Sequence, residues 1–231
     1  MIKYSKDGMC IYDSETHTYK IGSRKLQGVT GFISKYKNKF DAELVAENYV
    51  KKNGGDVKDL LAKWKLEGEI SCTNGTNVHT IFETYITTGE VILTGTPKEL
   101  VAEKFIKDYF LTGKLMAVEC EIVVYNEKVG LASQIDCVVK SDAGKYYILD
   151  WKTNKRIESN SYNKFMLDPF GHIPDSNYYH YSMQLGIYKR LCDYEIVGLY
   201  IVHIGTDNYD IIKADEDKAS LDSIFGMGGF S

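Results

Sequence analysis

The hydrophobic pattern of the chain changes from strand to helix and back to strand, and this order predicts its architecture. Near the N-terminus, Cys10–Asp13 and His17–Ile21 alternate as two short strands around a polar turn. From Val29 to about Gly89, apolar residues recur at the three-and-four spacing that is typical of helices. Gly54-Gly55 and Gly68 interrupt this pattern, so we expect several helices rather than one.

The second half of the chain is dominated by strand periodicity. After a helix over 98–111, which follows Pro97, come three segments rich in Val, Ile and Tyr: Leu115–Tyr125, Gly130–Lys140 and Tyr146–Thr153. Short turns separate these segments, which predicts an antiparallel meander. We expect the remainder to be a loop over 159–177, a helix over 178–192, strands over 196–204 and 209–213, and a short helix over 216–225.

This order of elements predicts an α/β (mixed α+β) fold, with a central mixed sheet flanked by helices and an N-terminal helical lobe. We interpret residues 1–231 as a single domain. Residues 1–112 would form the hairpin and helical lobe, and residues 113–225 would form the core that carries the chemistry. The glycine-rich residues 226–231 are expected to be a flexible tail, with docking of a partner as the weaker alternative.

Composition narrows the class of protein. The formal net charge is −4, so the chain does not resemble a generic basic nucleic-acid coat. Its five cysteines are far apart and include no CxxC pair, which indicates reduced thiols and argues against a zinc or iron–sulfur site. No apolar run approaches the roughly 20 residues of a membrane span. We therefore expect a soluble cytoplasmic protein that does not bind a membrane.

Candidate chemistry is concentrated in two neighbouring strands. Asp150 and Lys152 are two residues apart on one strand and so project from the same face. Asp136 lies on the preceding strand, and the short turn between the two can bring it beside Asp150. Two carboxylates and a lysine suit a Mg²⁺ or Mn²⁺ site that hydrolyses a phosphodiester, with the lysine orienting water or stabilising the transition state.

An acidic-x-lysine triplet is a weak signal by itself, because such triplets are common on exposed strands. Here, however, Asp150 follows Tyr-Tyr-Ile-Leu and precedes Trp151, a context that predicts burial. Buried charges are costly unless they are paired or bind a metal. This context favours a functional site over a surface ion pair.

The segment GLASQIDCVVKSDAGKYYILDWKT resembles the central hairpin of the PD-(D/E)XK nuclease superfamily, in its RecB-like branch. The branch commonly has Gly-x before its first Ile-Asp, whereas this chain has Ser133-Gln134. The resemblance implies a restriction-endonuclease-like core, with Asp136, Asp150 and Lys152 as catalytic residues.

Two further segments resemble motifs of the same branch, in the same order. GTNVHTIFETYI is similar to its upstream helix, which implies that His79 is a metal ligand together with Asp136 and Asp150. YSMQLGIYKRL is similar to its Q-x-x-x-Y helix, which implies that Gln184 and Tyr188 support the site or the scissile phosphate.

Three glutamates remain open. Glu83 lies one helical turn after His79, and Glu119 and Glu121 share one face of the strand before Asp136. Any of them could enter the site or be an exposed carboxylate. Of the two strand residues, Glu121 is preferred because it precedes an apolar run.

The N-terminal segment HTYKIGSRKLQGVTGFISKYKNKFD is similar to the openings of phage-encoded exonucleases of this branch. It also resembles a segment of the mitochondrial genome maintenance exonuclease, with Gln27-Gly28 in place of Pro-Ser. These resemblances imply a substrate of single-stranded DNA or DNA with free ends. Lysines interleaved with an aromatic residue suit a single-strand path, and the candidate contacts are Lys35, Tyr36, Lys37 and Lys39.

The sequence therefore predicts a metal-dependent deoxyribonuclease, most simply an exonuclease of DNA replication, recombination or repair in a bacterium or a phage-infected host cell. A structure-directed endonuclease shares every motif named above. A non-catalytic DNA-binding module would be expected to lack a metal carboxylate or the lysine. A protein partner is possible, but no segment identifies one.

Overall fold

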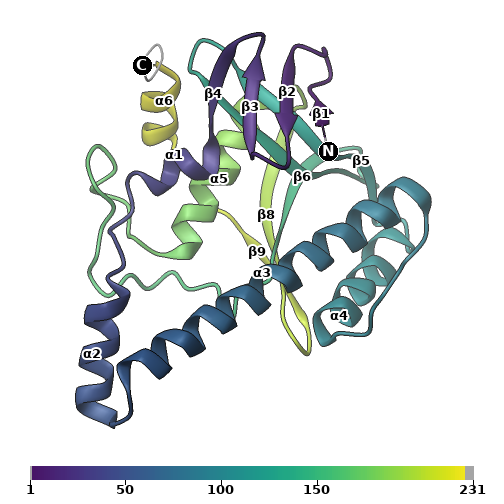
Figure 1. The fold of residues 1–231 in the computed structure, drawn as a ribbon. Helices are drawn as coiled ribbons and strands as arrows, with labels where there is room; N and C mark the ends of the chain where they lie inside the picture. The colour runs from purple at the N-terminus through teal and green to yellow at the C-terminus, as the bar shows by residue number, and fades with distance from the viewer. Residues whose placement is uncertain (1, 227–231) are drawn as a thin grey trace.

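A computed structural model describes residues 2–226, and its ribbon is shown in Figure 1. The expected glycine-rich tail, from residue 227 onward, lies outside the described residues. The chain forms a mixed α/β structure in which one large sheet, with both parallel and antiparallel pairings, is covered by helices on both faces. Among residues 2–226, none of the helices combines the length and the apolar composition needed to cross a bilayer.

The chain opens with strands, which include the expected hairpin, and the helices follow these strands rather than forming a lobe at the N-terminus. Four strands come first: β1 (Ile2–Tyr4), β2 (Cys10–Asp13), β3 (Thr18–Ile21) and β4 (Arg24–Gly28). Each pairs antiparallel with the next. Strand β4 has little strand periodicity of its own, since only Leu26 in it is buried. It is ordered by tertiary pairing, because it runs parallel to a strand of the central meander.

The meander follows the predicted pattern. Strands β5 (Leu115–Asn126), β6 (Leu131–Ser141) and β7 (Tyr146–Lys152) pair antiparallel. Strand β8 (Ile196–Ile204) runs parallel to β7, and β9 (Tyr209–Lys213) is antiparallel to β8. The long strand β6 is therefore the centre of the sheet: it contacts β4 and β7 along one edge and β5 along the other.

The sheet divides the apolar core into two layers. On one face, Ile135, Val138 and Ile148 pack against helices α1 (Val29–Ser34), α5 (Asn177–Leu191) and α6 (Lys218–Gly226). On the other face, the core is formed with α4 (Pro97–Phe105) and the π-helical turn that continues it over 106–110. The expected helix over 98–111 is therefore present, with a change of helix type in its last turn.

Helix α3 (Val57–Thr88) is one continuous helix, although an interruption of the helical pattern was expected at Gly68. At 32 residues it is about 48 Å long. Asp56 caps its start by accepting hydrogen bonds from the backbone N–H groups of Lys58 and Asp59, and Gly89 ends it in the left-handed conformation. A glycine inside a helix costs only about 1 kcal/mol, which these caps and the packing of the second half offset.

Figure 1 shows that α2 (Ala42–Asn53) and the first half of α3 extend away from the sheet as a helical arm. The second half of α3 lies against the sheet. Its anchor is Phe82, which is fully buried and stacks on Trp151 of β7 with 3.9 Å between ring centroids. This contact fixes the position of α3 relative to β7.

We predict that Phe82→Ala will destabilise the protein by about 3–5 kcal/mol, because it removes a large buried ring and leaves a cavity. Leu66→Ala, in the exposed part of the same helix, should change stability by less than about 0.5 kcal/mol. Urea unfolding followed by circular dichroism measures both. A loss below about 1 kcal/mol for Phe82→Ala would contradict the assigned anchor.

Candidate metal centre

The registers of the central strands bring three carboxylates into one row. Glu121 of β5 and Asp150 of β7 lie on either side of Asp136 on β6. Like charges in adjacent positions across a sheet repel one another. Such a row therefore requires compensation by cations.

The row lies where β6 changes its neighbour along one edge. Strand β4 pairs with Leu131 and Ala132, whereas the described pairing with β7 begins at Cys137. Between these points Asp136 has room to accept a hydrogen bond of 2.9 Å at Oδ2 from the backbone N–H of Trp151. The change of neighbour makes an opening in the sheet in which polar side chains can meet.

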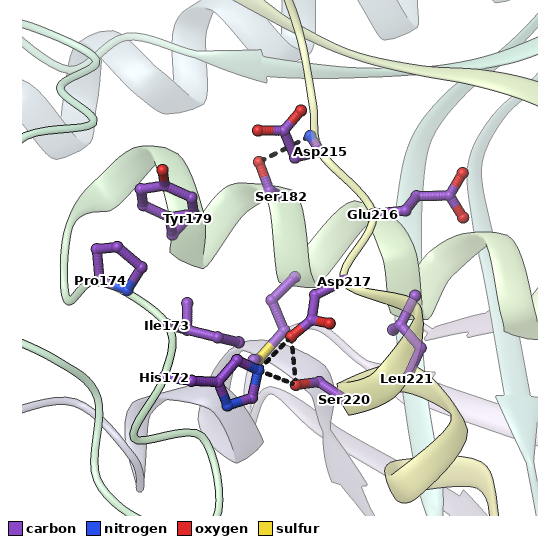
Figure 2. Close-up of a pocket in the computed structure, with 11 residues that line it drawn as sticks. His172, Ile173, Pro174, Tyr179, Ser182, Asp215, Glu216, Asp217, Ser220 and Leu221 are labelled. Atoms are coloured by element: carbon purple, nitrogen blue, oxygen red, sulfur yellow. Dashed lines mark hydrogen bonds and ion pairs between the residues drawn. The ribbon is translucent and has the colours of Figure 1, made fainter.

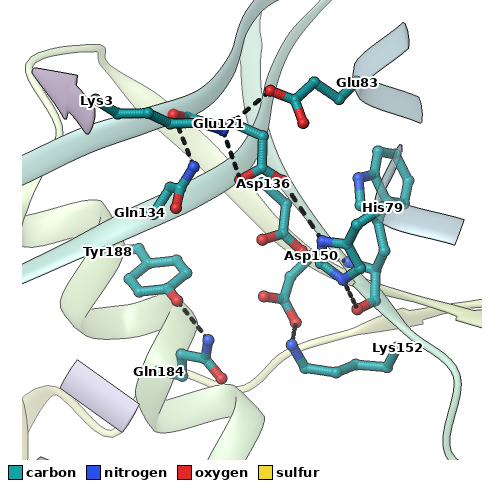
Figure 3. Close-up of polar contacts among 11 residues, drawn as sticks. Lys3, His79, Glu83, Glu121, Gln134, Asp136, Asp150, Lys152, Gln184 and Tyr188 are labelled. Atoms are coloured by element: carbon teal, nitrogen blue, oxygen red, sulfur yellow. Dashed lines mark hydrogen bonds and ion pairs between the residues drawn. The ribbon is translucent and has the colours of Figure 1, made fainter. Parts of the chain in front are cut away.

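His79 reaches this opening from helix α3. Gly75, one turn earlier, faces the end of β7, where an added Cβ would lie 3.3 Å from Thr153 Oγ1. The absence of a side chain at Gly75 lets the helix approach the strand closely. As a result, His79 Nε2 lies 3.2 Å from the carbonyl oxygen of Trp151 and 3.7 Å from Asp136 Oδ2, and Nδ1 lies 3.5 Å from Glu121 Oε1 (Figure 3).

His79, Glu121 and Asp136 form a group that could hold a metal ion. One ligand atom from each of the three side chains lies within 4.8 Å of the others. Glu121 has φ 53°, a left-handed backbone conformation that is uncommon for a residue with a side chain. Strained positions of this kind cluster at functional sites, which supports a functional use of the Glu121 carboxylate.

Asp150 and Lys152 lie beside this group. Asp150 is completely buried, and Lys152 Nζ lies 2.5 Å from its Oδ2 atom. Neither carboxylate oxygen of Asp150 accepts a hydrogen bond of regular geometry from residues 2–226. A buried carboxylate with unused acceptor capacity is costly, and a metal ion would use that capacity.

Burial and mutual charge set the protonation of the site. Burial raises the pKa of Asp136, against the opposing effect of His79 and Lys152. Burial also raises the pKa of Asp150 to about 6, with Lys152 opposing the shift and Asp136 adding to it. For His79, burial lowers the pKa, but the carboxylates of Asp136 and Glu121 outweigh it and raise the pKa to about 9. At neutral pH, His79 therefore carries a proton that compensates the carboxylates.

The residues present fit a metal ion. Their donors are mainly carboxylate oxygens, which hard divalent cations such as Mg²⁺ and Mn²⁺ prefer, with one imidazole. Of the predicted ligands, His79 and Asp136 belong to the group, Glu121 joins them, and Asp150 is the neighbouring carboxylate paired with Lys152.

Gln184 and Tyr188 lie together on helix α5, beside the carboxylates (Figure 3). Gln184 Nε2 donates a hydrogen bond to the hydroxyl group of Tyr188. Burial holds the pKa of Tyr188 well above its usual value, and the charges of Asp150 and Asp136 add to this effect. The two side chains thus face the charged site as a hydrogen-bonded pair.

The other two open glutamates have different partners. Glu83 forms an ion pair of 2.9 Å with Lys3, whose ammonium group also lies 3.7 Å from Glu121 Oε2. Glu119 accepts a hydrogen bond of 2.7 Å from the Tyr194 hydroxyl and lies 3.7 Å from Lys6. Both line a groove of about 940 Å³ between β1, β5 and residues 191–194, which Glu121 also lines. Strand alternation places Glu119 and Glu121 on one face, and the left-handed backbone of Glu121 and the different contacts of the two carboxylates distinguish them.

The residues predicted to contact nucleic acid differ in their exposure to solvent. Lys35 and Lys39 are exposed. Tyr36 instead packs edge-on against Phe32 and Phe170, so its ring belongs to the core. Burial lowers the pKa of Lys37, and the nearby Asp175 opposes this shift.

An exposed aromatic residue lies next to these lysines. The side chain of Phe40 is 71% exposed, and its ring centroid is 6.4 Å from that of Trp64 on α3. The pair is visible only once the chain is folded, because the two residues are 24 positions apart in the sequence.

A separate cavity of about 260 Å³ lies on the far side of α5 (Figure 2). His172, Asp217 and Ser220 meet at its rim, which superficially suggests a hydrolase triad. However, His172 Nε2 contacts both Asp217 Oδ2 at 2.6 Å and Ser220 Oγ at 3.3 Å. A triad needs the acid and the nucleophile on opposite ring nitrogens, so this arrangement is not one.

Comparison with known proteins gives distant structural similarity only. The fold is similar to that of the crystal structure of SSO0001, with 16% identity, a TM-score of 0.38, and coverage of 90% of this chain and 76% of that one. It is also similar to a crystal structure named as a putative exonuclease from Eubacterium rectale, with 12% identity, a TM-score of 0.32, and coverage of 84% and 66%. No family model matches the chain. A search of curated proteins likewise finds no match.

We predict that Glu121→Gln and Asp136→Asn will each weaken Mn²⁺ binding by about tenfold or more, because each removes a carboxylate of the metal group. Glu119→Gln is the matched control, since it lies on the same strand but hydrogen-bonds to Tyr194. Isothermal titration calorimetry measures the three affinities. Equal affinities for Glu121→Gln and Glu119→Gln would exclude Glu121 as a ligand.

We also predict that Mn²⁺ affinity will rise as the pH increases from 6.5 to 8.5. The pKa of His79 is raised to about 9, so below this pH the imidazole must lose a proton before it can bind metal. The apparent affinity should increase roughly tenfold per pH unit, since about one proton is released for each ion. His79→Gln should bind more weakly with a much smaller pH dependence. A wild-type affinity that does not change with pH would contradict this coupling.

Proposed function

We propose that this protein is a metal-dependent nuclease that hydrolyses DNA phosphodiester bonds. The observation that carries the proposal is the meeting of three carboxylates, His79 and Lys152 at one opening of the sheet, with the buried carboxylate of Asp150 lacking regular hydrogen bonds. A structural ion pair would not require a third carboxylate and a histidine at the same point. A site that binds a cation and an anionic substrate would use both the additional carboxylate and the histidine.

The roles follow from chemistry and position. Asp136 and Asp150, with His79 and Glu121, would hold Mg²⁺ or Mn²⁺. The bound ion would acidify a water molecule and offset the charge of the phosphate. Lys152, which is only 16% exposed at its side chain, would orient the water or stabilise charge in the transition state. Gln184 and Tyr188 would support the scissile phosphate from α5.

We further propose that the substrate is single-stranded DNA, cleaved from an end. Support comes from the start of the helical arm, where exposed Lys35 and Lys39 lie close in sequence to the Phe40–Trp64 pair. Lysines that contact phosphates and aromatic rings that stack on bases are the usual components of a single-strand path. Because α3 carries both Trp64 and His79, the arm would lead a strand toward the metal centre.

The test compares end-labelled linear and covalently closed circular single-stranded DNA, with Mg²⁺, Mn²⁺ or EDTA. We expect metal-dependent loss of the linear strand only. Lys152→Ala should lower the rate by about 10²–10³-fold, as expected when a charge-stabilising donor is lost. Lys145→Ala, an exposed lysine in the turn between β6 and β7, is the control and should keep full activity.

Three other outcomes would change the proposal. Cleavage of the circle would retain the site but make the protein an endonuclease. Binding of DNA without cleavage of either substrate would overturn the enzymatic proposal for these substrates. Full activity of Lys152→Ala would overturn the role assigned to the lysine.

A further inference from the structure

Lys152 has a second neighbour besides Asp150. Its Nζ atom lies 4.9 Å from the centroid of the Tyr181 ring. An ammonium group over an aromatic face is attracted by the electron density of the ring. The two side chains that contact the ammonium group belong to different elements, since Asp150 is on β7 and Tyr181 is on α5.

Tyr181 belongs to the face of α5 that lies toward the site. It is one helical turn before Gln184 and two turns before Tyr188, so the three side chains share one stripe of the helix. The Q-x-x-x-Y pattern of the sequence includes Gln184 and Tyr188 but not Tyr181. Tyr181 is half-buried against the core, with its hydroxyl group still used in a polar contact.

The hydroxyl group of Tyr181 holds the chain that follows Lys152. It donates a hydrogen bond of 2.7 Å to Oδ1 of Asn154. The backbone oxygen of Asn154 lies 2.7 Å from His203 Nε2, and His203 is paired with Lys152 in the parallel register of β7 and β8. The segment after Lys152 is therefore fixed from α5 on one side and from β8 on the other.

We propose that Tyr181 is a positioning residue for Lys152, a role that rests on the proposed nuclease function. Its ring fixes the ammonium group, and its hydroxyl group fixes the strand end through Asn154. Lysine has a long flexible side chain that could adopt several conformations. Tyr181 restricts it to the conformation in which the ammonium group contacts both Asp150 and the ring.

The kinetic test uses Tyr181→Leu, which removes the ring, and Tyr181→Phe, which keeps it. For Tyr181→Leu we expect kcat to fall roughly 10–100-fold with little change in KM or in Mn²⁺ affinity, as for a misplaced catalytic group. Tyr181→Phe should keep most of the wild-type kcat. The matched control is Tyr178→Leu, a half-buried α5 tyrosine whose hydroxyl group donates to the Lys213 carbonyl oxygen. It should keep the wild-type kcat.

A second readout needs no activity. In protein labelled at lysine carbons, the ring current of Tyr181 should shift the ε-proton signal of Lys152 upfield, with Lys152→Arg providing the assignment. The shift should persist in Tyr181→Phe and disappear in Tyr181→Leu. Loss of kcat together with loss of this shift would support the proposal.

Two results would overturn the positioning role. One is an equal fall in kcat for Tyr181→Leu and Tyr178→Leu, which would indicate core packing alone. The other is a Lys152 signal that does not respond to Tyr181→Leu. A wild-type protein that cleaves no DNA, but in which the Lys152 signal responds as predicted, would instead reject the nuclease function while retaining the Tyr181–Lys152 contact.

Discussion

The constraint on which the rest of the structure depends is the compensation of buried negative charge at the centre of the sheet. Asp150 is completely buried and Asp136 is 8% exposed. Carboxylates in such surroundings are costly unless cations or hydrogen bonds accompany them. Lys152 is supplied by the same strand, whereas His79 must come from a distant part of the chain. The position of α3 against β7 is therefore as important to the site as the strands themselves.

Much of this arrangement is predictable from the sequence, because it depends on local periodicity. The strand pattern predicted the meander and placed Asp150 and Lys152 on one face, and the order of motifs indicated His79, Gln184 and Tyr188. Where periodicity was weak, prediction failed. Strand β4 has one buried residue and is ordered by its pairing with β3 and β6. Gly68 suggested a break, but α3 continues through it.

The metal group shows a different limit of sequence reasoning. Glu119 and Glu121 are equivalent by alternation, and the apolar run after Glu121 was only a slight reason to prefer it. The two are distinguished by the left-handed backbone of Glu121 and by their contacts, since Glu119 accepts a hydrogen bond from Tyr194 whereas Glu121 lies beside His79. Such features depend on the folded neighbours rather than on local periodicity. The packing of Tyr36 has a related origin, since its ring lies against Phe170, more than a hundred positions away.

The proton on His79 links the electrostatics of the site to its proposed chemistry. Without a metal ion, the raised pKa of His79 means that its proton accompanies Asp136 and Glu121, in addition to the ammonium groups of Lys152 and Lys3. An incoming phosphate would then meet a cluster with excess negative charge, in a chain whose net charge is also negative. Replacing that proton by a divalent cation changes the local charge by one unit in favour of the phosphate. Binding of metal and binding of substrate should therefore be coupled, with the protonation state of His79 as the variable that both share.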